Sequence, residues 1–416
     1  MTFPKMAKIK QKFQTNPIQN IQKVVAEQFA KVGADDSIKP GMEVAITVGS
    51  RGIANIPLIV KYAGEEVKKR GATPFIIPAM GSHGGATAEG QIEVLEGLGV
   101  TEEATGCEIR SSMDVVEVGQ TDDGVPVYTD QHAYNADGII VMGRVKAHTD
   151  FKSTFESGIL KMASIGMGKH KQALALHTYG IKGIRDMMPD VGRVAISNTN
   201  TLFGFAIVEN AHEETTILEA ILPQDIDDRE PKLLTESIEL MPSIPVNEMD
   251  ILVVDEIGKN YSGTGMDTNI IGRIRVLGVE EPELPSVKYL IASDLSEASH
   301  GNALGIGLAD LTTKRLFEKI HFQAMNENVI TSTFLDRAKI PIVLDNDQKA
   351  LQAALRANWG VDDENARIVR IPNTLHIGEL YVSEVIFNEI KDQERIEVLE
   401  EPKDMEFDEA GYFYPM

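Results

Sequence analysis

The chain has 416 residues, of which 43% are hydrophobic and 25% are charged. This length exceeds a single compact core and predicts about two domains, and the composition is typical of a folded globular protein. The formal net charge of −23 repels nucleic-acid phosphates and anionic lipids. We therefore expect neither a nucleic-acid nor a membrane partner. A binding site for a small anionic substrate would need basic side chains close to the substrate.

Cysteine and hydropathy restrict the compartment and the metal chemistry. Cys107 is the only cysteine, which excludes an internal disulfide and any cysteine-based metal site. A metal would have to rest on histidine, aspartate or glutamate. The first residues lack the apolar core of a signal peptide, and no run of about 20 apolar residues follows. The sequence therefore predicts a cytoplasmic protein.

The first half of the chain alternates short apolar runs with helical periodicity. Strands are predicted at residues 44–48, 74–77 and 138–142, and helices at residues 18–32, 56–70 and 88–98, the last with Thr87 as N-cap. Asp123 and Gly124 predict the turn of a hairpin within residues 115–128. Such alternation indicates βαβ units with a parallel sheet, which bind ligands at the carboxyl ends of the strands.

A domain boundary is predicted near residues 242–247, where prolines and polar residues precede a new strand. We expect an N-terminal α/β domain over residues 1–245 and a C-terminal α/β domain over residues 246–416 that closes an interdomain cleft and ends in an acidic tail. In the second half, strands are predicted at residues 251–254, 287–292, 342–344 and 368–371, and helices at residues 311–325 and 348–358. The fold class is thus α/β, with a Rossmann-like, mixed or mostly parallel sheet flanked by helices in each domain.

Several common fingerprints are absent. No glycine pair completes G-x-G-x-x-G, and the chain lacks a phosphate-binding G-x-x-x-x-G-K-[ST] loop, an H-E-x-x-H zinc motif and a G-x-S-x-G nucleophile motif. The glycine-rich loop at residues 257–267 could fold its amides around a phosphate or simply form a tight connection.

Three residues just after predicted strands are candidates for acid–base chemistry and substrate binding. His83 lies in GSHGG before a helix, and His148 follows the strand at residues 138–142. Imidazole titrates near neutral pH and can exchange protons with a substrate. Arg51, in VGSRG, offers paired donors that match a carboxylate. Taken singly, the histidines could equally be turn or surface residues, and the arginine could form a structural ion pair.

Two further residues are candidates for cofactor binding. Lys161 lies in the apolar run FESGILKM, where loss of solvation would make its amine nucleophilic, although many such lysines only extend to the surface. His177 ends the run KHKQALALH and could bind a metal through a ring nitrogen, or could be an ordinary helix-terminal histidine.

In this order, the five positions resemble the nickel-dependent lactate racemase family, of which the chain looks like a divergent member. The resemblance implies that Lys161 carries a nickel-pincer nucleotide as a thioamide and that His177 completes the nickel coordination. It makes His83 and His148 the proton-transferring pair and assigns Arg51 to the substrate carboxylate. Lys314, in LTTKRL, resembles the family's second-domain lysine, which also faces the carboxylate.

The resemblance implies a racemase or epimerase of a small 2-hydroxy acid. The substrate would lose its hydroxyl proton to a histidine and its α-hydrogen as hydride to the nickel-pincer nucleotide. The family's cofactor also implies partner proteins that synthesise it. Two alternatives remain at this stage: an oxidoreductase or dehydratase that uses the same cofactor, and a nucleotide-binding protein without catalysis. A homo-oligomer is compatible with the sequence, which leaves the oligomeric state open.

Overall fold

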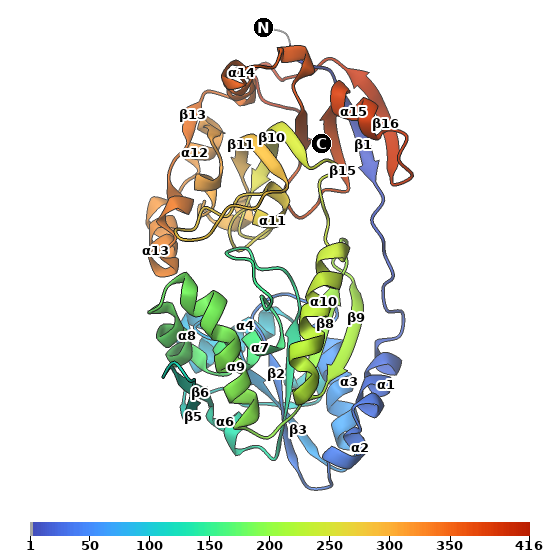
Figure 1. Ribbon diagram of the computed structural model, residues 1–416, viewed down its shortest axis with the longest axis vertical. Coiled ribbons are helices and arrows are strands. Elements are labelled where there is room, and N and C mark those ends of the chain that lie inside the picture. The colour runs from blue at the N-terminus through green and yellow to red at the C-terminus, as the bar shows by residue number, and fades with distance from the viewer. Residues whose placement is uncertain (1–2) are drawn as a thin grey trace. The chain divides into compact units, whose positions relative to one another are not determined.

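The computed structural model describes residues 3–416, which form two compact units (Figure 1). The N-terminal unit comprises residues 14–241. The C-terminal unit comprises residues 242–416 together with the segment up to Phe13. This division differs from the expected domain of residues 1–245, because the first strand belongs to the sheet of the other unit.

The N-terminal unit is built on a six-stranded sheet of order β4-β3-β2-β7-β8-β9. Neighbouring strands run parallel except for the antiparallel pair β8 and β9. The strands of this unit, including the separate β5–β6 hairpin, are β2 (Glu43–Val48), β3 (Thr73–Pro78), β4 (Glu108–Ile109), β5 (Val115–Gln120), β6 (Pro126–Asp130), β7 (Gly138–Arg144), β8 (Thr201–Glu209) and β9 (Thr215–Ile221). The chain adds strands outward from β2 through β3 to β4 and then returns to add β7 on the other side of β2. The order therefore reverses between β2 and β7, which is where open α/β sheets form a ligand crevice.

Helices cover both faces of this sheet. On one face, α1 (Ile21–Lys31), α3 (Ile56–Lys69) and α4 (Ala88–Gly97) bury apolar side chains against the strands. On the other lie α7 (Ile159–Lys161), α8 (Lys169–His177), α9 (Met188–Ser197) and α10 (Ile226–Leu240). Shorter elements are α2 (Ala34–Ser37), α5 (Glu102–Thr105), α6 (Gln131–Asn135), and the π-helical turns η2 (Met162–Gly166) and η3 (Gly183–Met187). The result is a three-layer α/β/α unit.

The predicted elements of the first half are present, with boundaries shifted by a few residues. Thr87 caps α4 as expected, because its side-chain oxygen accepts the backbone N–H of Gly90 at 3.1 Å. The hairpin turns at Asp123 and Gly124, where Gly124 has a φ of 80°. Residues 178–241 had no predicted elements, yet they supply α9, α10, β8 and β9.

The C-terminal unit is built on an eight-stranded sheet of order β13-β12-β11-β10-β14-β15-β1-β16. The five strands from β13 to β14 are parallel, and β15, β1 and β16 are joined by antiparallel pairing. The strands are β1 (Met6–Gln11), β10 (Glu248–Ile257), β11 (Ser286–Leu295), β12 (Leu311–Thr313), β13 (Ile342–Leu344), β14 (Ile368–Ile371), β15 (Glu379–Ser383) and β16 (Ile396–Lys403). The helices are α11 (Thr268–Ile271), α12 (Lys314–Glu318), α13 (Phe322–Ser332), α14 (Asp347–Ala357) and α15 (Glu384–Ile390).

The first strand lies far from its sequence neighbours in the fold. In Figure 1, blue β1 lies beside the red strands β15 and β16, with which it pairs on its two edges. Ala7 and Ile9 are buried in the core of this sheet together with Leu380 and Val382. These contacts explain why the segment before Phe13 belongs to the C-terminal unit.

The expected helix over residues 311–325 is wrong. Leu311, Thr312 and Thr313 are buried and form β12, which pairs with β11 and β13. A helix follows only at α12, and α13 begins separately after His321, whose Nδ1 accepts the backbone N–H of Ala324 at 3.2 Å. Threonine is β-branched and favours strands, and β12 has a partner strand on each side with which to pair.

The expected acidic tail is largely regular structure, since it contains α15 and β16. Across residues 3–416, no helix is both long and apolar enough to cross a membrane. The two parallel-rich sheets with flanking helices confirm the predicted α/β fold class.

Candidate functional site

The loops that follow β2, β3 and β7 carry Arg51, His83 and His148, so all three lie at the carboxyl edge of the N-terminal sheet. The segment from α7 through η2 packs against the same edge. A Cβ on Gly143 would lie 2.6 Å from Cγ of Met162, and a Cβ on Gly49 would lie 3.4 Å from Cε of Met162. Glycines at these strand ends thus allow Met162, the neighbour of Lys161, to approach the sheet between β2 and β7, where the strand order reverses.

The His83 loop is fixed by glycines and by contact with α4. Gly84 has a φ of 66°, and a Cβ there would lie 2.6 Å from the backbone nitrogen of Gln91. Only glycine combines this backbone conformation with so close an approach. The ring Nδ1 of His83 forms a hydrogen bond with Oγ of Ser50, the neighbour of Arg51. This contact links the loops that follow β2 and β3.

The ring of His148 is oriented by its own loop. Its Nδ1 accepts the backbone N–H of Asp150 at 3.1 Å, and the ring stacks on Phe151 with centroids 4.4 Å apart. The backbone N–H of His148 donates to the carboxylate of Glu156. Because Nδ1 acts as an acceptor, a neutral ring carries its proton on Nε2.

Lys161 has a strongly altered pKa. The pKa of its amine is lowered to about 8, mainly by burial; Arg51 acts in the same direction, and the carboxylates of Asp150 and Glu156 oppose the change. The pKa of His83 is lowered to about 4, mainly by partial desolvation from the surrounding protein although the residue is exposed, with Arg51 and Lys161 acting in the same direction. These groups are therefore close enough to influence one another's charge.

His177 and Arg51 belong to the same electrostatic neighbourhood. His177 is an exposed residue, and partial desolvation by the surrounding protein is the main cause that lowers its pKa; Lys161 adds to this and Asp150 opposes it. Arg51 is exposed as well, and its pKa is also lowered mainly by partial desolvation, with a contribution from Arg144. The N-terminal unit thus brings Arg51, His83, Lys161 and His177 together, and Asp150 connects them to His148.

Lys314, the remaining candidate, lies in the C-terminal unit. It is the first residue of α12, its side chain is 61% exposed, and its amine lies 3.6 Å from the carboxylate of Glu318.

Four residues with clear structural roles at this site were not among the candidates. Asp150 and Glu156 supply the negative charge near Lys161. Arg144 donates to the carbonyl oxygen of Gly52 at 3.0 Å and pairs with Glu209 at 2.6 Å, which ties β7 to the Arg51 loop. Glu230 contacts the start of α7. Only Asp150, two residues after His148, could have been suspected from its position in the sequence.

The side chains around Lys161 are compatible with a metal ion that is held mainly by a cofactor and takes few ligands from the protein. Within the described residues, no cluster of three or more histidine, cysteine, aspartate or glutamate side chains could hold an ion unaided. His177 lies within electrostatic reach of Lys161, whose amine is partly neutral at neutral pH. This pair suits a cofactor that attaches to the lysine and takes one further metal ligand from the histidine.

The glycine-rich loop at residues 257–267 is a tight connection. The backbone N–H of Gly258 donates to the carbonyl of Gly265 at 2.8 Å, and those of Tyr261 and Ser262 both donate to the carbonyl of Gly258 at 3.1 Å. A Cβ on Gly265, which has a φ of 78°, would collide with the carbonyl of Leu304. Because these amides bond within the loop, they are not available to cradle a phosphate.

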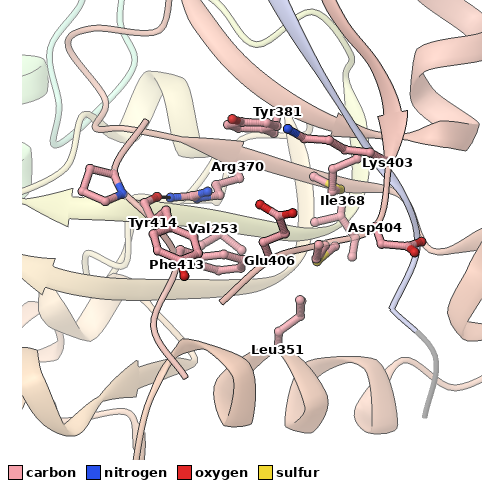
Figure 2. Close-up of a pocket in the computed structure, with 13 residues that line it drawn as sticks. Val253, Leu351, Ile368, Arg370, Tyr381, Lys403, Asp404, Glu406, Phe413 and Tyr414 are labelled. Atoms are coloured by element: carbon pink, nitrogen blue, oxygen red, sulfur yellow. Dashed lines mark hydrogen bonds between the residues drawn. The ribbon is translucent and has the colours of Figure 1, made fainter. Parts of the chain in front are cut away.

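The lining of a separate pocket in the C-terminal unit includes Arg370 and Lys403, both of which have partners (Figure 2). Arg370 points into it but holds Asp255 through two hydrogen bonds of 2.7 and 2.8 Å. Lys403 pairs with Glu400 at 2.6 Å. The pocket contains none of the candidate residues, so we place the candidate site at the edge of the N-terminal sheet.

Comparison with known proteins points to one family. Residues 5–186 match the family model described as the lactate racemase N-terminal domain. The fold is similar to the structure of the lactate racemase apoprotein from Thermoanaerobacterium thermosaccharolyticum, with a TM-score of 0.53 and 12% sequence identity over 89% of this chain and 99% of that chain. No curated protein sequence matched the chain. The matched residues include Arg51, His83, His148, Lys161 and His177. The N-terminal part of the chain is thus similar to the N-terminal domain of lactate racemases.

Proposed function

We propose that the protein is a racemase or epimerase of a small 2-hydroxy acid that works with a nickel-pincer nucleotide. One observation carries the proposal: Lys161, with its lowered pKa, shares the carboxyl edge of one sheet with two histidines and Arg51. The match of residues 5–186 to the lactate racemase N-terminal domain supports a racemase-type activity.

Lys161 is the proposed attachment point. With a pKa of about 8, a substantial fraction of its amine is neutral, and hence nucleophilic, at physiological pH. His177, at the end of α8, is the proposed protein ligand to nickel. When bound, the cofactor would accept the hydride from the substrate's α-carbon and return it to either face. Proteins that synthesise the cofactor are the partners that this proposal requires.

His83 and His148 are proposed to move the hydroxyl proton. A pKa of about 4 keeps the His83 ring neutral at physiological pH, so it can act as a base. The Nδ1 contacts to Ser50 and to the Asp150 N–H hold the two rings in defined orientations. Because the two enantiomers direct their hydroxyl groups differently, two bases on separate loops suit a reaction that runs in both directions.

Arg51 is proposed to bind the substrate carboxylate. A guanidinium can hold both carboxylate oxygens while the substituents at the α-carbon move, which is an orientation effect. Lys314 is proposed as a second carboxylate-binding residue on the basis of its sequence context alone.

The direct test is production of the full chain together with the proteins that make the pincer nucleotide. Mass spectrometry should find a nucleotide-sized adduct on the peptide containing Lys161, with stoichiometric nickel, and the protein should equilibrate the enantiomers of one 2-hydroxy acid in a screen. His83→Ala and His148→Ala should each abolish turnover. An unmodified Lys161, under conditions that load a known family member, would refute the proposal. Accumulation of a keto or dehydrated product would instead indicate an oxidoreductase or dehydratase.

A further inference from the structure

Three polar side chains of the N-terminal unit meet in its interior without any role in the proposed chemistry. Lys169, Gln91 and Asp130 each have no exposed surface. The amine of Lys169 lies 3.1 Å from the carboxylate of Asp130, donates to Oε1 of Gln91 at 3.0 Å, and donates to the carbonyl of Pro78. The ammonium therefore contacts three segments of the chain, through one ion pair and two hydrogen bonds.

This arrangement is costly to maintain. Removal of an ammonium and a carboxylate from water costs free energy. The attraction between the two buried charges often does no more than offset this cost, so such a pair adds little stability. Burial indeed lowers the pKa of Lys169 despite the nearby Asp130. Lys169 also adopts a φ of 56°, a conformation that non-glycine residues rarely take. A group that is both buried and strained suggests a requirement for geometry.

Gln91 transmits this geometry to the His83 loop. Its side-chain amide donates to the carbonyl of Gly81 at 3.0 Å and to the carbonyl of His83 at 3.3 Å. Its other end is held by Lys169, which is the first residue of α8. Since α8 ends at His177, one connected set of contacts reaches both the loop of a proposed base and the helix of the proposed nickel ligand.

We propose that Lys169, Gln91 and Asp130 form a positioning network that fixes the His83 loop relative to α8. None of the three is catalytic, because each acts through the backbone of the loop or the helix. The assignment rests on the proposed function only for its kinetic consequence. Its structural content, that Gln91 determines the surroundings of the His83 ring, can be tested without cofactor or substrate.

The test uses Gln91→Met, which keeps the size of the side chain but removes its hydrogen bonds. The matched control is Gln172→Met, because Gln172 is equally buried but bonds instead to the backbone of Tyr128 at 2.8 Å and Pro126 at 3.1 Å. Both variants lose a buried amide and should lose similar stability. Only Gln91→Met should alter the environment of His83.

The first readout is the titration of the His83 ring by NMR in full-length, cofactor-free protein with labelled histidine, assigned with His83→Gln. In the wild type the midpoint should lie near pH 4. In Gln91→Met, release of the loop should let the ring move away from Arg51 and Lys161, which lower its pKa, and so raise the midpoint by about one unit or more towards 6.5, while Gln172→Met should match the wild type. An unchanged midpoint in folded Gln91→Met would overturn the proposal.

Gln91→Glu covers the case in which Gln91→Met does not fold. An ionised glutamate can still accept from Lys169 but cannot donate to the carbonyls of Gly81 and His83, so the His83 midpoint should again rise. In cofactor-loaded protein, Gln91→Met should lower kcat by about tenfold or more with KM within about twofold, as expected for misplacement of a catalytic group. If the wild type has no racemase activity, the NMR result still decides the positioning role, so the two proposals fail independently.

Discussion

The carboxylate of Glu230 accepts the backbone N–H of Ile159 at 3.1 Å. The same oxygen accepts the N–H of Leu160 at 3.3 Å, and the Glu230 side chain, in α10, is 2% exposed. These are the first two N–H groups of the helical segment that carries Lys161, and they have no partner within their own helix. Glu230 therefore stabilises the start of the segment that presents the proposed attachment lysine.

This contact predicts an unusual dependence of stability on pH. Burial raises the pKa of the Glu230 carboxyl from 4.5 to about 7, although the two N–H groups oppose the change. The folded state therefore binds this proton more tightly than the unfolded chain, so the stabilisation is complete below pH 4.5 and is lost as the pH rises to 7. Glu230→Gln keeps the accepting oxygen and does not titrate, so it should gain about 3 kcal/mol relative to the wild type between pH 4.5 and 7.5.

Urea unfolding of both proteins over this pH range would measure the difference. Glu236→Gln, on the same helix with a 41% exposed side chain, controls for the general loss of an acidic group. Parallel pH profiles for Glu230→Gln and the wild type would show that the pKa of the Glu230 carboxyl is not raised in the folded protein.

Gly158 should not tolerate a side chain. A Cβ at Gly158 would collide with the carboxylate of Glu230, which is held by its bonds to Ile159 and Leu160. Gly158→Ala should cost about 1–3 kcal/mol of unfolding free energy, because either the helix start or Glu230 must move. In a Glu230→Ala background the same substitution should cost clearly less, and additive losses in the double variant would contradict this explanation.

Lys161 should react with acylating reagents at a lower pH than surface lysines. Because burial lowers its pKa to about 8, its labelling rate in the cofactor-free protein should rise with a midpoint near pH 8, whereas exposed lysines titrate near 10.4. Asp150→Asn should shift the Lys161 midpoint further down, since the Asp150 carboxylate stabilises the charged amine. Pulse labelling followed by peptide mass spectrometry gives both profiles; a Lys161 profile that matches surface lysines would be inconsistent with a desolvated amine.

The proposed roles of His177 and Lys161 should be separable in the cofactor-loaded protein. His177→Ala should retain the nucleotide adduct on Lys161 and lose most of the nickel, because the imidazole is the proposed protein ligand to the metal. Lys161→Arg should lose both adduct and nickel, because a guanidinium cannot form the thioamide. Metal analysis and intact mass distinguish the two, and full nickel occupancy in His177→Ala would remove this residue from the coordination sphere. His170→Ala, an exposed histidine on the same helix, is the control.

The sequence predicted the position of Arg51, His83 and His148 well because parallel strands bring their carboxyl ends to one edge, so residues just after such strands become neighbours. Glu230 and Gln91 could not be found in this way. In the helix IDDREPKLLTESIEL, Glu230 looks like any other acidic residue, and only tertiary packing brings it to Ile159. The error at residues 311–325 has a related cause, since the burial of Thr312 and Thr313 between two other strands is not visible in local periodicity.

The placement of β1 between β15 and β16 has a consequence for biosynthesis. The N-terminal unit is continuous in sequence and can complete its core once residues up to Met241 have left the ribosome. The strand that precedes it must wait for residues 396–403 before both of its edges are paired. During that interval β1 exposes unpaired backbone groups, which favour association with other chains. The N-terminal unit can therefore fold before the sheet that contains β1 is complete.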